Sequence, residues 1–426
     1  MAEAAAKPGD QSVLDGAALP DKMGWSEAAR KDALDRVAQM GLPARRDEYW
    51  RFTNPTTLTQ RAAPAAKVLV TDEAPMFEDV DKLQLLFVDG VFRPDLSDAL
   101  ALEHCEIEKL SASMDKDIHW AKELYGVLEA RGQSPVPRPM AALNTAIAPA
   151  GSLIRVTGEV PKPISLRYIH EDETSDVAIH HVIKVETGGA VTILESGPAA
   201  ARFNKVMEVD VADGASFNHI RAQGRDHERR AVTHIFARLG EESSFKSFTM
   251  TVNGVLTRNE AVIEFTGDNA QAHIAGACVG DGDFHHDDTV FITHDGVNCE
   301  SRQVFKKVLR NGATGVFQGK ILVQPDAQKT DGYQISQGLL LDDDSQFLAK
   351  PELEIYADDV ACSHGSTVGS VNEDALFYLT SRGVQKSDAQ NMLVLAFLAE
   401  AMDEIEDPAL AEGLTARLAA WMDRRS

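Results

Sequence analysis

The chain has 426 residues, of which 44% are hydrophobic and 25% charged, so its composition is that of a folded protein with a large buried core. Its 42 basic residues are outnumbered by 66 acidic ones, which gives a formal net charge of -24. A surface this acidic repels nucleic-acid phosphates and anionic lipid headgroups, so the composition argues against nucleic-acid and membrane-surface roles.

Targeting signals and cysteine usage set the expected compartment. No apolar stretch of the sequence reaches the roughly 20 residues that a membrane-spanning helix needs, and the N-terminus lacks the pattern of a secretory signal. The four cysteines are far apart and too few for a disulfide framework: Cys105, Cys278, Cys299 and Cys362. We therefore expect a cytoplasmic protein with reduced thiols.

Residues 1–80 form the first predicted region, which is mostly helical. An amphipathic helix is expected to begin after Ser26, acting as its N-cap, and to end at the Gly-Leu-Pro sequence of residues 41–43. Residues 44–61 are expected to follow as a short helix or an arm.

Residues 81–372 form the second predicted region, a β core. Apart from a helical excursion expected near 115–131, its hydrophobic residues recur with a period of two, and its strands end at turn pairs such as Asn253-Gly254 and Asn311-Gly312. No helix alternates with the strands, which leaves a sandwich, a barrel or a β-solenoid. The run of short strands is large for one sandwich and suits a solenoid, although no sequence motif of fixed period accompanies it.

Residues 373–426 are expected to be helical again. Asn372 opens a first helix, Ser387 caps a second, and Asp407-Pro408 starts a third. An apolar stripe on these helices is most often core, but beside a β core at a chain end it also suits the groove of a partner.

The densest ionisable cluster in the sequence is the segment from Phe284 to Asp288. His285 and His286 have the donor atoms that divalent metals bind, but neighbouring residues of a strand point to opposite faces. We therefore expect these histidines to be solvated or structural. The P-loop pattern is absent from the sequence, so ATP hydrolysis by this chain is not expected.

Cys362 and His364 form the second constellation. Residues i and i+2 of a strand share one face, so this thiol and this imidazole are expected side by side. The pair suits a soft metal, an iron–sulfur cluster or a nucleophile couple. Two ligands do not hold a metal, so further ligands must come from elsewhere in the fold or from a partner.

Motifs spread over most of the chain carry a family resemblance. They occupy residues 41–43, 48–51, 142–146, 311–321, 328–331, 339–341, 351–355, 362–365 and 378–383. In combination they resemble the SufB/SufD family of scaffold proteins in Suf iron–sulfur cluster assembly. The Cys-Ser-His-Gly sequence of residues 362–365, the chain length and the Glu-x-Trp segment favour the SufD branch over the SufB branch.

The resemblance implies a mainly β fold: a right-handed parallel β-helix with helical N-terminal and C-terminal regions. It implies a non-catalytic scaffold that pairs with SufB through the end of the β-helix and whose C-terminal helices dock the ATPase SufC, with a homodimer when isolated. The docking candidates are Tyr378, Arg382, Leu395, Leu398 and Met402. His364 and Cys362 are then shared metal ligands at the SufB junction, where iron or a cluster is bound transiently and no cofactor permanently.

A carbohydrate-active β-helix enzyme is the alternative function, with Asp287-Asp288 or Asp358-Asp359 as its acid and base. Adjacent carboxylates point to opposite faces of a strand, and such enzymes tend to be secreted, so this alternative is disfavoured. A hexapeptide-type acyltransferase is a third possibility, and the missing short-period repeat argues against it.

Overall fold

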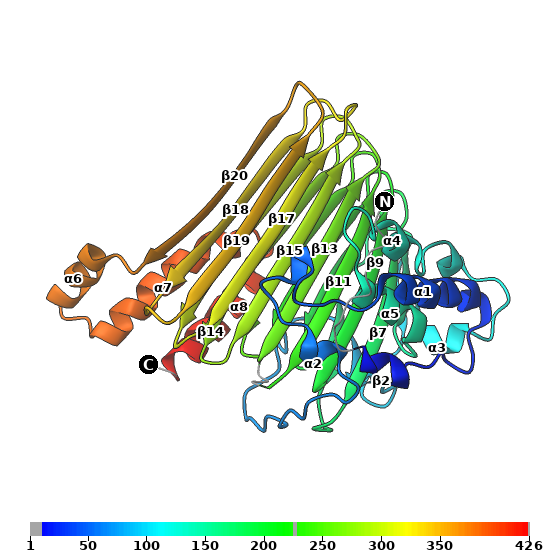
Figure 1. Ribbon diagram of the computed structural model, residues 1–426, viewed down its shortest axis with the longest axis horizontal. Coiled ribbons are helices and arrows are strands. Elements are labelled where there is room, and N and C mark those ends of the chain that lie inside the picture. The colour runs from blue at the N-terminus through cyan, green and yellow to red at the C-terminus, as the bar shows by residue number, and fades with distance from the viewer. Residues whose placement is uncertain (1–10, 225–227, 425–426) are drawn as a thin grey trace.

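A parallel β-helix forms the middle of the structure, a computed structural model that describes residues 11–224 and 228–424 (Figure 1). From β5 onward, successive strands alternate between two ten-stranded sheets, and about seven turns result. The predicted parallel β-helix with helices at both ends is therefore confirmed.

The two sheets are named sheet A and sheet B. Sheet A contains β1 (Leu83–Val88), β2 (Val91–Phe92), β6 (Ile164–Ile169), β8 (Ala190–Ser196), β10 (Ser216–Gln223), β12 (Ser244–Val252), β14 (Gln271–Asp281), β16 (Glu300–Arg310), β18 (Asp331–Leu340) and β20 (Ala361–Ser370). Sheet B contains β3 (Ala101–Leu102), β4 (Cys105–Lys109), β5 (Ser152–Val156), β7 (Asp176–Val185), β9 (Arg202–Val211), β11 (Arg230–Leu239), β13 (Leu256–Phe265), β15 (His285–His294), β17 (Thr314–Val323) and β19 (Gln346–Ile355).

The number of residues per turn varies along the β-helix. Arg230 of β11 pairs with Leu256 of β13, 26 residues on, whereas Thr314 of β17 pairs with Gln346 of β19, 32 residues on. The strands still stack in register, because the turns between them absorb the difference. This variation explains why the sequence shows no motif of fixed period.

The predicted turn pairs adopt the backbone that such pairs favour. Asn311 and Gly312 have φ values of 55° and 86°, and Asn253 and Gly254 have values of 61° and 104°. Asparagine and glycine populate this left-handed region at lower cost than other residues. These pairs therefore allow the chain to turn sharply between the two sheets.

Alternate residues of each strand fill the lumen between the sheets. Most of them are apolar and form one continuous core, which includes Ile193, Phe245, Phe305 and Phe317. The outward-facing residues of sheet A form a second apolar cluster with the C-terminal helices. Each sheet is thus buried on the lumen side and, over part of its length, on its outer side too.

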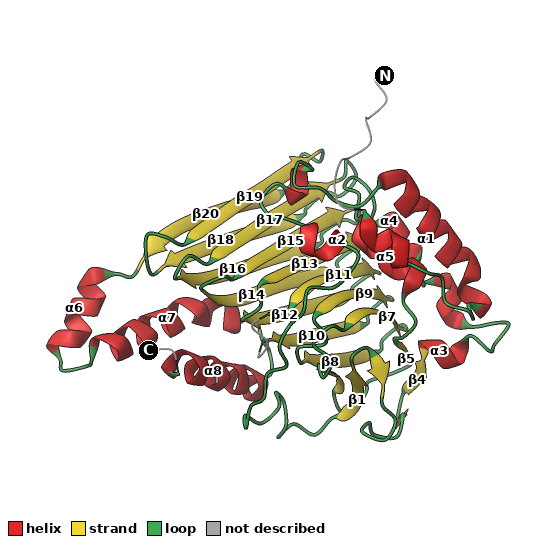
Figure 2. Ribbon diagram, turned by 60° about the horizontal axis from the view of Figure 1, so that its bottom comes forward, coloured by secondary structure: helices red, strands yellow, loops and turns green. Residues whose placement is uncertain are grey.

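N-terminal helices cover the outer face of sheet B (Figure 2). They are α1 (Glu27–Met40), α2 (Thr56–Thr59), α3 (Leu110–Ser113), α4 (Val127–Arg131) and α5 (Pro139–Ile147). Ser26 precedes α1 as predicted, but its hydroxyl donates to the carbonyl of Met23 instead of capping a helical N–H.

One predicted helix, over residues 115–131, is wrong in extent. The segment holds a 3₁₀ turn at Trp120–Glu123 and the short α4, which are separated by Gly126 at a φ of 72°. A left-handed residue cannot continue a right-handed helix, so the chain bends there and starts again.

C-terminal helices cover part of the outer face of sheet A. They are α6 (Glu373–Ser381), α7 (Lys386–Met402) and α8 (Pro408–Asp423), and α7 packs against β14 and β16. Asn372 and Asp407 accept helical N–H groups at 2.9 and 2.8 Å, as predicted for the first and third helices. The second helix begins at Lys386, so Ser387 lies inside it and is not its cap.

Candidate functional site

The two ends of the β-helix differ in how they finish. At the first turns, the short strands β2, β3 and β4 run antiparallel to their neighbours, and β2 and β3 are the edge strands there. At the last turn, β19 pairs only with β17 and β20 pairs only with β18. β20 is exposed over almost its whole length, so its second edge of N–H and C=O groups is open to a further strand (Figure 1).

Cys362 and His364 lie on β20, on the face that continues the lumen. In the ladder Cys362 is opposite Gly332 and His364 is opposite Gln334. Gln334 is completely buried, so this face points inward. The structure thus brings the two predicted site residues onto one face, and it leaves the imidazole of His364 exposed because no further turn covers it.

Glycine makes room for the Cys362 thiol. A Cβ atom at Gly332 would lie 3.1 Å from Cys362 Sγ, closer than ordinary packing allows. The thiol is half-buried beside Ile321 and Val323, and burial raises its pKa above the ordinary value. The thiol is therefore protonated at neutral pH in the free chain, and a metal bound there must displace this proton.

Below His364, a polar ladder leads from the open end into the lumen. Gln334 Nε2 donates to Gln303 Oε1 at 3.0 Å, and the hydroxyls of Ser336 and Ser366 lie 2.7 Å apart. Gly319 leaves the space that Gln334 fills, because a Cβ atom there would lie 2.3 Å from its Nε2 atom. The alternation of β18 could have revealed this ladder, but its register with β20 could not be read from the sequence.

Within the described ranges 11–224 and 228–424, no three His, Cys, Asp or Glu side chains are grouped closely enough to hold a metal ion. Cys362 and His364 therefore supply two donors without a third from the described residues. A metal or cluster at this position needs ligands from another molecule.

The predicted docking residues divide into two groups. Tyr378 lies on α6, which projects away from the β-helix (Figure 1), and Arg382 follows the helix as its C-cap. The Arg382 guanidinium lies 5.0 Å from the Tyr378 ring centre. Leu398 and Met402 are buried in α7 against sheet A, and Leu395 packs partly against the same cluster. Leu398 and Met402 therefore belong to the core and offer no docking surface, which corrects the prediction for them.

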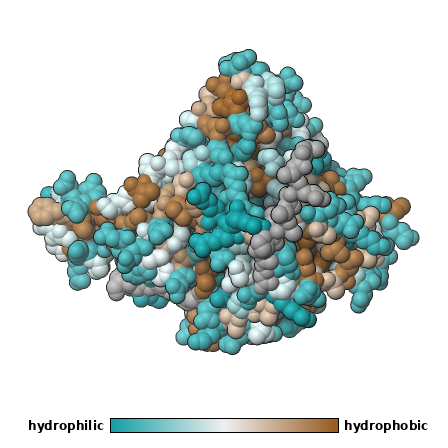
Figure 3. Space-filling model, viewed as in Figure 1, coloured by the Kyte–Doolittle hydropathy of each residue, from teal (hydrophilic) through white to brown (hydrophobic). Residues whose placement is uncertain are grey.

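Helix α6 presents an apolar surface that sequence reasoning missed in part. Phe377 is 73% exposed and Tyr378 56% exposed, and no residue of α6 is buried. Figure 3 shows apolar side chains between hydrophilic ones on this projecting arm. The signal was present in the sequence, since Phe377 stands beside Tyr378, but only the structure shows that both side chains are left exposed by the described part of the chain.

The acidic and histidine side chains of strand β15 form hydrogen bonds within the folded core. Asp287 accepts from the Thr53 hydroxyl at 2.5 Å on the outer face, whereas Asp288 accepts from Lys307 at 2.6 Å in the lumen. His285 is 2.9 Å from Thr53, and His286 is 2.7 Å from Lys307. The two histidines thus lie on opposite faces as predicted, but both are hydrogen-bonded instead of solvated.

The same geometry bears on the carbohydrate-enzyme alternative. Asp287 and Asp288 cannot act together, because a sheet separates their carboxylates. Asp358 and Asp359 lie in the turn between β19 and β20. Neither pair forms the facing carboxylates that glycoside hydrolysis needs.

No helix in the part of the chain that the structure describes is both long and apolar enough to cross a membrane.

Comparisons with known proteins agree with the fold. Residues 168–397 match the SufBD core domain of the SUF system for FeS cluster assembly. The chain is 28% identical to the iron-sulfur cluster assembly protein SufD of Escherichia coli, over 90% of each chain. It is 25% identical to the SufD protein of Bacillus subtilis, over 94% of each chain, and 29% identical to the chloroplastic protein ABCI7 of Arabidopsis thaliana, over 58% of this chain and 54% of that one.

Proposed function

The chain belongs to the SufBD family of iron–sulfur cluster assembly proteins, and we propose that it is a non-catalytic scaffold subunit that pairs with SufB and docks the ATPase SufC. Its cargo is iron or a nascent iron–sulfur cluster, which it holds transiently and jointly with the partner. The observation that carries the proposal is the open last turn of the β-helix, where Cys362 and His364 face the lumen without a covering strand.

The open edge favours a partner that continues the sheets. β20 offers a row of backbone groups for strand addition, and exposed apolar side chains lie at the same end: Ile355, Tyr356 and Val368. Natural proteins seldom leave a long edge and apolar side chains uncovered together. SufB, as a second β-helix of the same family, is the partner that this surface suits.

The side chains of Cys362 and His364 suit a cluster that forms only when this chain and SufB are both present. Thiolate and neutral imidazole are the binding forms of cysteine and histidine. Burial raises the pKa of the Cys362 thiol, so this thiol is protonated in the free chain. A metal cation that binds there must displace the proton. Ligands from SufB would supply the missing donors, which makes loading depend on the pairing.

Helix α6 is the proposed contact for SufC. Its uncovered Phe377 and Tyr378 suit an apolar groove, with Arg382 at the rim. Helix α7 connects this arm to sheet A through buried apolar contacts, and Glu404, just after the helix, pairs with Arg302 at 2.6 Å. If SufC moves helix α6, this movement would thereby be transmitted to the strands next to the open end.

The test is co-expression of this chain with SufB and SufC, followed by size-exclusion chromatography and anaerobic reconstitution read by visible absorbance. His364→Ala is expected to leave the complex intact and to reduce cluster formation at least tenfold. His104→Ala, which removes an exposed imidazole from the turn between β3 and β4, is the matched control.

A second pair of variants tests the SufC contact. Phe377→Ser with Tyr378→Ser is expected to release SufC and to keep SufB bound, whereas Ile118→Ser, at a side chain that is also exposed, is expected to change neither. Undiminished cluster yield from His364→Ala would remove the site assignment. A chain that binds neither SufB nor SufC would remove the scaffold proposal.

A further inference from the structure

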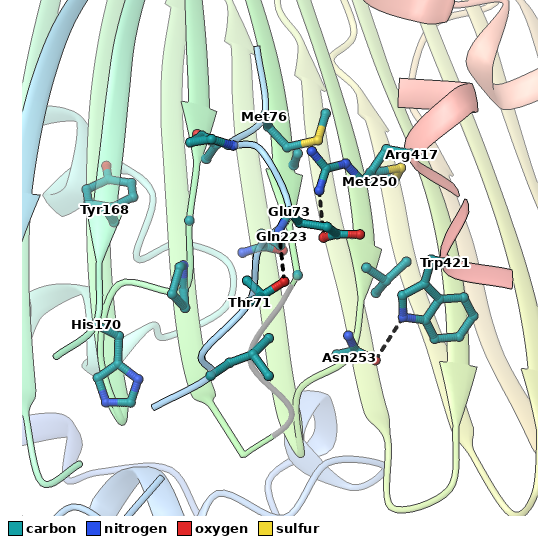
Figure 4. Close-up of a pocket in the computed structure, with 18 of the residues that line it drawn as sticks. Thr71, Glu73, Met76, Tyr168, His170, Gln223, Met250, Asn253, Arg417 and Trp421 are labelled. Atoms are coloured by element: carbon teal, nitrogen blue, oxygen red, sulfur yellow. Dashed lines mark hydrogen bonds and ion pairs between the residues drawn. The ribbon is translucent and has the colours of Figure 1, made fainter. Parts of the chain in front are cut away.

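A pocket lies against the outer face of sheet A, away from both the open end and helix α6. It has a volume of about 510 Å³, and its walls come from sheet A, from the segment of residues 69–76, which we call the strap, and from helix α8. Figure 4 shows Thr71, Glu73 and Met76 of the strap running across the strands of sheet A, with Trp421 of α8 to one side. A space of this size is typical of sites that hold small organic molecules.

The strand register gives the floor of the pocket an elongated shape. Arg167 of β6 is opposite Ser196 of β8, which is opposite Ala222 of β10, which is opposite Met250 of β12. All four residues line the pocket. Strands lie about 4.8 Å apart, so this row of four positions spans about 14 Å. The two small side chains in its middle leave a trough between the two large side chains at its ends.

One end of the row is cationic. The Arg167 side chain is half-buried, and it forms no hydrogen bond or ion pair with any residue that the structure describes. A guanidinium keeps its charge at any physiological pH, and its fork of N–H donors matches a carboxylate. This end of the trough therefore suits the acidic group of a ligand.

The other end of the row is apolar. Met250 packs in one cluster with Leu418 and Trp421 of α8. Trp421 Nε1 donates to Asn253 Oδ1 at 3.2 Å, so the polar atom of the indole already has an acceptor. This end of the trough therefore suits a hydrocarbon group.

The strap closes the trough without adding an uncompensated negative charge. Glu73 is the only carboxylate among the described residues that line the pocket. Arg417 donates to it at 2.6 Å, and Arg424 pairs with it at 2.6 Å. These pairs attach the strap to α8, and they neutralise the one lining group that would repel an anion.

We infer that this pocket binds an unbranched carboxylate of medium chain length, such as a free fatty acid. The carboxylate accepts from the Arg167 guanidinium, the chain lies over Ser196 and Ala222, and its end packs against Met250 and Trp421. An acid without a chain reaches only one end of the row, so the length of the trough selects an extended ligand. The inference does not depend on the proposed function, because it uses neither Cys362 and His364 nor helix α6.

The first experiment measures the binding of decanoate to the full chain by isothermal titration calorimetry, below the concentration at which decanoate forms micelles. Benzoate has the charge without the chain, and decanol has the chain without the charge. Each is expected to bind at least tenfold more weakly than decanoate. A chain that does not bind decanoate, or that binds all three compounds equally, would overturn the inference.

Matched variants test the cationic end. Arg167→Gln is expected to weaken decanoate binding at least tenfold, because it removes the charge that pairs with the carboxylate. Arg51→Gln removes an exposed arginine that does not line the pocket and is expected to change the affinity by less than twofold. Equal affinities for the two variants would show that decanoate binds elsewhere.

The position of the ligand is tested by diffraction from crystals of the full chain soaked in ω-bromodecanoate, with data collected at the bromine absorption edge. The bromine peak is expected beside Trp421 and the carboxylate at Arg167. Bromine peaks confined to the protein surface, a ligand lying in the opposite direction, or a pocket occupied by another part of this chain would overturn the inference. This measurement uses the unmodified chain, so it decides the matter even if Arg167→Gln fails to fold.

Discussion

In the middle turns of the β-helix the inward-facing carboxylates of Glu195 and Asp288 each have a lysine partner, whereas in the last turn Cys362 and His364 face the lumen and no described strand covers them. Both regions are built from strands with the same alternation, and they differ only in whether another turn follows. A turn inside the stack satisfies its polar groups across the lumen. A turn at the end of the stack keeps its polar groups available for another molecule.

The two regions also differ in how burial shifts the pKa values of their side chains. Burial lowers the pKa of Lys205 to about 8 although Glu195 opposes the shift, which shows how strongly the closed lumen disfavours an unpaired charge. At the open end, burial raises the pKa of Cys362, but only part of the side chain is covered. The same desolvation thus makes each charge in the middle turns depend on its partner, and it keeps the accessible thiol at the end neutral.

The largest expected effect comes from breaking a pair in the middle turns. Lys205→Met leaves the Glu195 carboxylate buried without its lysine, and we expect a loss of roughly 3–5 kcal/mol in the free energy of unfolding. Urea unfolding followed by circular dichroism measures the loss. Lys116→Met, which breaks the partly exposed pair with Glu108, is expected to cost less than about 1 kcal/mol. Equal losses for the two variants would contradict the distinction between buried and exposed pairs.

The second-largest effect is expected from acid, which destabilises the middle turns. Burial lowers the pKa of His219 to about 4 and those of His181 and His294 to about 3, so these imidazoles bind protons more readily after unfolding. The stability that they contribute is complete above about pH 6.5 and is lost as the pH falls toward the folded values. We expect these three histidines to lower the free energy of unfolding by at least about 2 kcal/mol between pH 6.5 and pH 4. Glu129 and Glu208 oppose this loss, because burial raises their pKa values to about 7 and about 8.

The pH dependence has its own matched pair of variants. His219→Gln is expected to make the decline below pH 6.5 shallower, because one of the titrating groups is gone. Ile118→Ser, which changes an exposed side chain without a titratable group, is expected to leave the slope unchanged. A steeper slope in His219→Gln would show that another group dominates the titration.

At the open end, a charge introduced on β20 is expected to weaken pairing with SufB more than it destabilises the fold. Val368 lies on the lumen-side face of β20 and is 55% exposed, so Val368→Lys is expected to change the free energy of unfolding by less than about 0.5 kcal/mol. The same change is expected to weaken association with SufB at least tenfold, measured by size-exclusion chromatography or calorimetry. Ile274→Lys, at a buried lumen position of β14, is expected to prevent folding.

The smallest effect concerns the reactivity of two thiols. Burial raises the pKa of Cys278 to about 12 and also raises that of Cys362, but Cys278 is enclosed in the lumen and Cys362 is half-buried at its end. Under native conditions we expect iodoacetamide to label Cys362 at least tenfold faster than Cys278, as read by peptide mass spectrometry. Faster labelling of Cys278 would mean that the middle turns open more readily than the end.

The sequence by itself determined the local structure of this protein. Alternation gave the strands, Asn-Gly pairs gave the turns, and Asn372 and Asp407 gave the starts of two C-terminal helices, because these signals act between residues that are close in the chain. The i, i+2 spacing of Cys362 and His364 likewise placed both on one face of one strand. Three local predictions were wrong: Gly126 interrupts the helix expected over residues 115–131, and Ser26 and Ser387 do not cap the helices that were expected to start there.

The tertiary structure alone decided which elements lie next to which. The apolar stripe of α7 could equally be core or docking surface in the sequence, and packing on sheet A makes Leu398 and Met402 core. Turns of 26 to 32 residues hide the repeat, so the register that pairs Lys205 with Glu195 cannot be read from spacing. Contacts between residues far apart in the chain depend on how the turns stack, and this information is distributed over the whole fold.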